Sequence, residues 1–246
     1  SHPGVFRLAV AAFGLGLVLV TWLLARHLFG ARAAVVAAAG TALTPPLLLA
    51  ATQVWPDVPG AALGLLAVAL FVWATGGDRP SWAMTALVPV VAAATFVRYG
   101  APLPIATGLL VVALWRRRLL WRHPLAAAVT ALGATGAVVA VLAVPRLTGA
   151  PTAPLGAVGS ASQVFSGFGD YLRLFHEAAG PAVVILALIG VLTALALASR
   201  EAADRGALLA ACAACLVTVA GLAVVLHGEV RYLAPAYPWL WVAGAP

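Results

Sequence analysis

The sequence predicts an all-α fold, a polytopic transmembrane helix bundle of about eight spans plus a partial ninth. Hydrophobic residues make up 64% of the 246-residue chain and charged residues only 9%, whereas a soluble domain usually carries about 25% charged residues. Apolar runs also recur along the whole chain, and roughly 20 apolar residues cross a bilayer core of about 30 Å. These observations exclude a cytosolic domain, a disordered chain and a disulfide-stapled secreted module, and they predict that 1–246 is a single transmembrane domain.

The predicted spans follow the apolar runs in chain order. Each run ends where an Arg, Gly, Pro or Asp interrupts it, because such residues are costly or helix-breaking within a bilayer. The third and fifth runs are short for a full crossing, and the stretch from Pro102 to Pro104 is expected to bend the chain where the fifth begins. Because the chain starts without Met and ends inside an apolar segment, we expect a fragment of a longer protein. The predicted spans are 6–26, 33–55, 59–75, 82–98, 101–115, 124–145, 181–199 and 207–226, with a ninth beginning near 232.

The arginines predict the orientation of the bundle. All fourteen basic residues are Arg, against seven acidic residues, and most stand singly between apolar runs, which favours a role in orienting helices over nucleic-acid binding. If the spans alternate, nine of the fourteen fall in four loops on one side, near 26–32, 76–81, 115–123 and 200–206. Short basic loops stay in the cytoplasm, so this side is predicted to be cytoplasmic. The run Arg116 to Arg118 is expected to contact anionic lipid as well.

One long connection, 147–180, is predicted to lie on the outer, non-cytoplasmic face. Its end, near 170–177, places Leu172 and Phe175 among charged residues, which indicates a short amphipathic helix lying along the membrane. Long loops in compact folds often have a function. The segment is either a lid at a ligand site or a simple linker.

Asp57 is the candidate catalytic residue. It lies between Pro56 and Pro59 in a tight turn that joins two predicted spans on the outer face, with Gln53 just before it as a candidate substrate-binding residue. A carboxylate fixed there can act as a general base, bind a metal or orient a hydroxyl nucleophile. An alternative interpretation is an N-cap, because Asp57 stands at a helix start.

The other candidate substrate-binding residues follow two later spans. Arg98 and Tyr99 end the fourth span, where an Arg can bind phosphate through two hydrogen bonds and a Tyr adds a hydroxyl; the alternative is an interfacial Arg whose charge reaches the headgroups. A second polar cluster near the ninth span is also suited to phosphate binding. The alternative is a plain ion pair between its acid and its Arg. This cluster contains His227, Glu229, Arg231 and Tyr232.

Other chemistry has little support in the sequence. Cys212 and Cys215 lie in an Ala-rich apolar run with no second Cys pair or nearby His, so we expect buried packing thiols. The chain has no nucleotide-binding Gly-rich loop and no hydrolase or zinc-protease motif. The cofactor is unknown; a divalent metal is possible, although no ligand spacing indicates one.

The order of several short motifs resembles the GT-C superfamily of integral-membrane glycosyltransferases, in the branch of protein O-mannosyltransferases and lipid A aminoarabinose transferases. The resemblance spans nearly the whole chain, and each motif is short. The motifs are Pro3 to Arg7, Leu24 to Arg32, Thr44-Pro45, Trp55-Pro56-Asp57, Phe96 to Gly100 and Glu229 to Pro235.

The resemblance implies that a sugar is transferred from a polyprenyl-phosphate donor in the lipid bilayer to an acceptor on the non-cytoplasmic face of a bacterial plasma membrane. Asp57 would match the acidic position of the second outer loop, Arg98 a basic residue near the lipid phosphate, and Arg231-Tyr232 a late basic-aromatic pair. In that family the principal catalytic acid lies in a first outer loop, upstream of the position equivalent to Pro3. This chain lacks that loop. The alternative is a transporter or flippase for a lipid or small anion, which predicts a broken helix such as the one suggested by Thr44-Pro45-Pro46.

Overall fold

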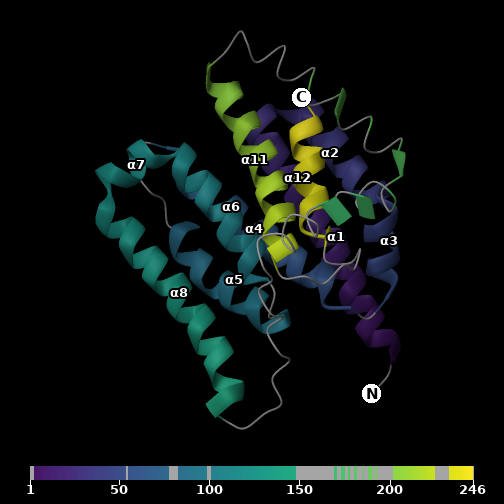
Figure 1. The fold of residues 1–246 in the computed structure, drawn as a ribbon, viewed down its shortest axis with the longest axis horizontal. Helices are drawn as coiled ribbons and strands as arrows, with labels where there is room; N and C mark the ends of the chain where they lie inside the picture. The colour runs from purple at the N-terminus through teal and green to yellow at the C-terminus, as the bar shows by residue number, and fades with distance from the viewer. Residues whose placement is uncertain are drawn as a thin grey trace.

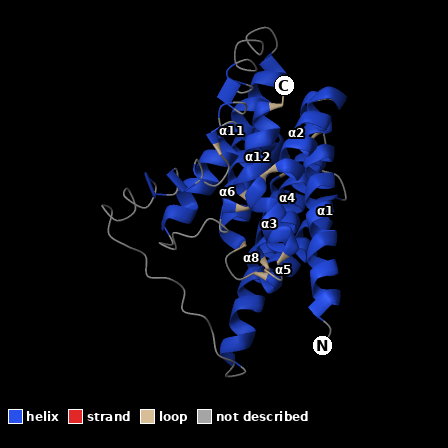
Figure 2. Cartoon of the chain, turned by 90° about the vertical axis from the view of Figure 1, so that its right-hand side faces the viewer, coloured by secondary structure: helices blue, strands red, loops and turns tan. Residues whose placement is uncertain are grey.

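The computed structural model describes residues 3–53, 55–77, 83–98, 101–147, 202–224 and 233–245, with single residues between 169 and 192. Every regular element in these ranges is a helix, as Figure 2 shows. The predicted all-α fold is therefore confirmed. The helices are α1 (Pro3–Phe29), α2 (Ala31–Leu43), α3 (Pro45–Thr52), α4 (Asp57–Ala74), α5 (Ala83–Val97), α6 (Pro102–Trp115), α7 (Arg117–Arg122), α8 (Pro124–Leu147), α11 (Ala202–Val224) and α12 (Ala236–Gly244).

The helices have the length and composition of a multi-pass membrane protein. Among the described residues, α1, α4 and α8 are each long and apolar enough to cross a bilayer alone, and the bent pair of α2 and α3 adds a possible fourth span. Helices α5 and α6 are apolar but shorter, as the sequence predicted for the fifth run. The third run was also predicted to be short for a crossing, which is wrong, because α4 begins at Asp57 and is long enough to cross. Most of the predicted span 181–199 lies outside the described residues.

Helix α4 forms the centre of the bundle and packs against α1, α5 and α6. Within its span 78% of residues are buried, against 6% for the span in α8. Small residues allow the close approach that membrane helices use for packing. A Cβ on Gly108 of α6 would lie only 2.8 Å from Val68 of α4, so glycine is required at that crossing.

The second predicted span is not one straight helix. It is broken at Thr44 into α2 and α3, which meet at 59°, because Pro45 begins α3 and supplies no backbone N–H to continue α2. The buried hydroxyl of Thr44 donates to the Gly40 carbonyl at 2.7 Å and accepts from Trp241 Nε1 at 2.9 Å. The Thr44 hydroxyl at the break is thus hydrogen-bonded on both sides, and the Trp241 ring of α12 covers Gly40.

The predicted basic loops gather at one end of the bundle. A Cβ built on Gly206 would lie 2.6 Å from Trp115 Nε1, and one built on Gly76 would lie 3.4 Å from His27 Nε2. Arg116 is also close enough to His27 for an electrostatic interaction between the two side chains. Figure 1 shows α7 joining α6 to α8 at the end of the molecule opposite the N-terminus. This end, called the basic end, holds Arg26, Arg32, Arg116, Arg117, Arg118 and Arg122.

Candidate functional site

Asp57 lies at the end of the bundle opposite the basic end. Helix α4 begins at Asp57 and ends at Ala74 near the basic end, and its 18 residues rise about 27 Å. The position before it, the N-cap, is Pro56. Asp57 is therefore the first residue of the helix and not its cap, which corrects the N-cap interpretation. Its carboxylate is only 2% exposed and lies at the positive end of the α4 dipole.

Arg98 is the partner of this carboxylate. It directly follows α5, and its Nη2 lies 2.9 Å from Asp57 Oδ1, with side-chain exposures of 11% for Arg98 and 3% for Asp57. The two residues come from neighbouring antiparallel helices, so the start of α4 and the end of α5 meet at the same end. A charge-assisted contact of this length between poorly hydrated groups is strong, and each charge depends on the other for its stability in an apolar setting.

The first turn of α4 also shapes the path of the Arg98 side chain. A Cβ on Gly60 would lie 3.1 Å from Arg98 Cβ and 3.2 Å from Arg98 Cδ. The aliphatic part of Arg98 therefore crosses the backbone of α4 at Gly60, where no side chain stands in its way. The Arg98 backbone is fixed as well, because its N–H donates to Ala94 and its carbonyl accepts from Ala101.

An apolar cluster packs beside the ion pair. Val10, Ala50 and Val58 are buried together, and Trp55 packs against them, so α1, α3 and α4 are joined next to Asp57. Gln53, the predicted substrate-binding amide, is half-buried at the C-terminal end of α3. These contacts hold the turn from α3 to α4 and fix the position of Asp57.

The structure brings together only part of the predicted site. Asp57 and Arg98 form a contact, and Gln53 lies four positions before Asp57 in the chain. The remaining predicted site residues lie outside the described residues: Tyr99, His227, Glu229, Arg231 and Tyr232. In the parts of the chain that the structure describes, no three His, Cys, Asp or Glu side chains group in a way that could hold a metal.

Two other predictions concern described residues away from the ion pair. Cys215 is buried and its thiol donates to the Ala236 carbonyl at 3.7 Å, while Cys212 is half-buried, as expected of packing thiols. Within the predicted amphipathic segment near 170–177, Arg173 Nε lies 2.8 Å from Glu177 Oε1, and both side chains are exposed. Most of the 147–180 connection is outside the described residues, so its role as a lid stays a prediction.

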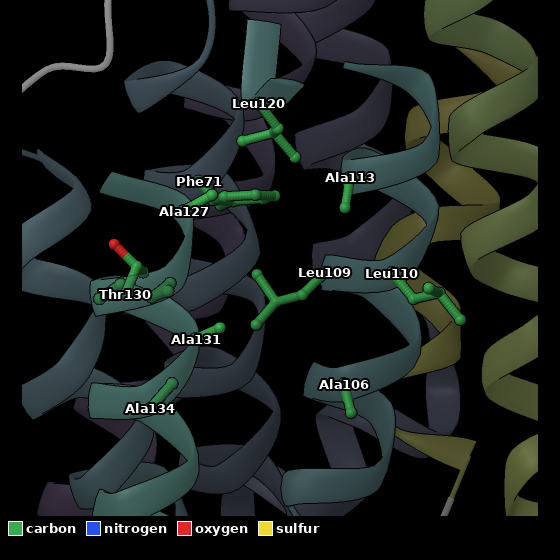
Figure 3. A pocket seen from close by; sticks show the side chains of 11 residues that line it. Phe71, Ala106, Leu109, Leu110, Ala113, Leu120, Ala127, Thr130, Ala131 and Ala134 are labelled. Atoms are coloured by element: carbon green, nitrogen blue, oxygen red, sulfur yellow. The ribbon is translucent and has the colours of Figure 1, made fainter. Parts of the chain in front are cut away.

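The sequence interpretation missed two features. The first is Gly60. The sequence could have indicated it, because it is a glycine one helical turn after the candidate acid Asp57. The second is an apolar cavity of about 330 Å³ lined by residues of α4, α5, α6, α7 and α8, which Figure 3 shows in close-up. Its signal was the recurrence of Ala127, Ala131 and Ala134 along one face of α8, because such small residues leave space beside a neighbouring helix.

These features define a class of protein: a helical membrane bundle with a buried Asp–Arg pair at the end opposite the basic end. The chain belongs to the dolichyl-phosphate-mannose-protein mannosyltransferase family, which matches residues 3–144, more than half of the chain. This places it in the GT-C superfamily that the motif order resembled.

Two solved structures share this fold. They are ArnT from Cupriavidus metallidurans in the apo state, with 22% identity and a TM-score of 0.70, and the same protein bound to undecaprenyl phosphate, with 23% identity and a TM-score of 0.69. The alignments cover 97% and 98% of this chain but only 44% and 45% of ArnT, so the chain spans less than half the length of that protein. A comparison with curated protein sequences gives no match.

Proposed function

We propose that the protein containing this chain transfers a sugar from a polyprenyl-phosphate donor to an acceptor at the end of the bundle where Asp57 and Arg98 lie. Family membership supports glycosyl transfer, and one of the two ArnT structures that share the fold is described as bound to undecaprenyl phosphate. The observation that carries the proposal is the buried contact between Asp57 and Arg98. The end that holds this contact is proposed to face away from the cytoplasm, because it lies opposite the basic end.

Arg98 is the residue proposed to bind the donor. When a polyprenyl phosphate leaves the sugar, negative charge develops on its phosphate, and a fixed cation there stabilises the transition state. A guanidinium is a planar fork of five N–H donors, so it is able to contact a carboxylate and a phosphate from different edges. Its position is defined before the substrate arrives, because Asp57 and the backbone at Gly60 already hold the side chain.

Asp57 is proposed to position Arg98. Of the roles that the sequence left open, a general base needs access to the acceptor hydroxyl. Asp57 is 2% exposed and one of its oxygens contacts Arg98, which favours an orienting role over proton abstraction. The group that activates the acceptor is then expected to be a residue other than Asp57.

The transporter alternative gains nothing from the break in the second span. A transporter would use such a break to present polar backbone to a substrate. Here the buried Thr44 hydroxyl at the break is already hydrogen-bonded to the Gly40 carbonyl and to Trp241 Nε1. Pro45 accounts for the break and Trp241 packs against it, so we do not propose a transport function.

The proposal is tested with the purified protein and undecaprenyl phosphate as the probe. Arg98→Gln is expected to weaken undecaprenyl phosphate binding by about tenfold to a hundredfold, because hydrogen bonds to charged groups contribute about 1.5–3 kcal/mol. Arg173→Gln is the matched control, because Arg173 is an exposed arginine in an ion pair of similar length. Transfer of the sugar in membranes is measured in parallel.

Folding is checked separately, so that loss of binding is not confused with unfolding. Asp57→Asn is expected to keep the protein folded in detergent while transfer falls sharply, because Arg98 is no longer held. If Arg98→Gln and Asp57→Asn both bind undecaprenyl phosphate and transfer sugar like the unchanged protein, the proposed site is wrong.

A further inference from the structure

The apolar cavity reaches α7 at the basic end and is suited to hydrocarbon. Ala106 and Ala113 of α6 line one wall and are seven residues apart, about 10 Å along the helix. Ala131 lines the opposite wall, on α8 (Figure 3). The one hydroxyl in the lining, on Thr130, already donates to the Ala126 carbonyl at 2.8 Å. The lining therefore offers methyl, isobutyl and phenyl groups, and the cavity of about 330 Å³ is suited to part of an acyl chain.

Helix α7 joins this cavity to the basic end. Leu120 on one side of α7 lines the cavity, while Arg117 and Arg118 on the same short helix are exposed. Arg116, immediately before α7, is half-buried with its guanidinium 4.0 Å from the Trp115 ring, and its Nε is buried without a hydrogen-bond partner. Burial also lowers the pKa of Arg116. Arg117 and Arg118 therefore present the accessible charge beside this end of the cavity, and Arg116 adds to it.

We propose that this cavity and the run Arg116 to Arg118 form a binding site for an anionic glycerophospholipid. The acyl chain lies between α6 and α8, and the phosphate of the headgroup contacts Arg116, Arg117 and Arg118. Charge complementarity and the largely apolar cavity point to the same ligand, because a phospholipid carries an anionic headgroup next to its acyl chains. Helix α8 is largely exposed, with 6% of its span buried, so it faces lipid along its length.

A polyprenyl-phosphate donor fits this site less well than a structural phospholipid. Its phosphate would sit at α7, whereas the Asp57–Arg98 pair lies at the far end of α4, about 27 Å away. A donor bound in this way would present its sugar at the wrong end of the bundle. The lipid site is therefore separate from the transfer site proposed above, and its test does not depend on catalysis.

The headgroup contact is tested by native mass spectrometry of the purified protein with added phosphatidylglycerol or phosphatidylcholine. We expect phosphatidylglycerol to bind more tightly, and Arg117→Gln/Arg118→Gln to weaken it about thirtyfold, since each Arg near an anionic lipid surface contributes about 1 kcal/mol. Arg7→Gln/Arg32→Gln is the matched control, because it also removes two exposed arginines but leaves α7 unchanged. An equal loss in both double variants would show general charge attraction and overturn the site.

The acyl-chain contact is tested by filling the cavity. Ala131→Phe places a ring in the cavity and is expected to weaken phosphatidylglycerol binding, whereas Ala128→Phe adds the same ring to an exposed position of α8 outside the lining. A photo-crosslinker at position 131 is expected to attach to lipid. Attachment to protein, or displacement of phosphatidylglycerol by an equal concentration of undecaprenyl phosphate, would overturn the proposal.

Discussion

Breaking the Asp57–Arg98 pair is expected to destabilise the protein far more than breaking the exposed pair Arg173–Glu177. The two contacts are almost equal in length, 2.9 Å and 2.8 Å, but the side-chain exposures are 11% and 3% for the first and 75% and 53% for the second. Removing one partner of a buried pair leaves an uncompensated charge and costs about 3–5 kcal/mol. An exposed helix pair contributes about 0.5 kcal/mol or less.

The difference is large enough to measure. At about 1.4 kcal/mol per tenfold change, Asp57→Asn raises the unfolding equilibrium constant by roughly a hundredfold to several thousandfold. Glu177→Gln should change it by about twofold or less. Equilibrium unfolding in mixed detergent and SDS micelles, followed by circular dichroism, gives both values under one condition.

A double variant separates the pair from its surroundings. Asp57→Asn/Arg98→Met removes both charges, so it should be more stable than Asp57→Asn alone, because no charge is left buried without a partner. If Asp57→Asn is no more destabilising than Glu177→Gln, or if the double variant loses the sum of the two single losses, the pair is not coupled as described and the reasoning fails.

Three further changes test the packing around these features by thermal unfolding in detergent. Gly40→Ala should cost about 1–3 kcal/mol, because the new methyl group collides with the Trp241 ring; a neutral result would show that the ring is free to move. Trp241→Phe should cost about 1 kcal/mol or more, since it removes the indole N–H that donates to the hydroxyl at the helix break. Gly60→Ala should destabilise the protein by about 1 kcal/mol and reduce transfer by shifting Arg98, whereas Gly16→Ala, with open space around it, should be neutral or stabilising.

The sequence was sufficient to predict the helical membrane fold because apolar runs and basic loops report on the bilayer, which acts on each segment separately. The same rule placed the start of α4 and the end of α5 at one end and the arginine-rich loops at the other. It also identified Thr44-Pro45-Pro46 as a place where a span could break, because Pro cannot continue the hydrogen-bond ladder.

The sequence pattern of each segment did not predict which helices contact one another. Asp57 and Arg98 were each candidate site residues, but nothing in their local sequence shows that they touch or that Pro56 occupies the cap position. The cavity depends on how far apart α6 and α8 lie, which α7 and the packing of α5 determine together. A row of alanines indicates that space is available but does not show whether another helix fills it.

The hydroxyl at the break between α2 and α3 receives its indole partner from a residue 197 positions later in the chain. During synthesis, therefore, the kink between α2 and α3 is made well before α12, the helix that supplies its hydrogen-bond donor. A chain that ended before α12 would leave Gly40 without the Trp241 ring that covers it, and the Thr44 hydroxyl without its indole donor.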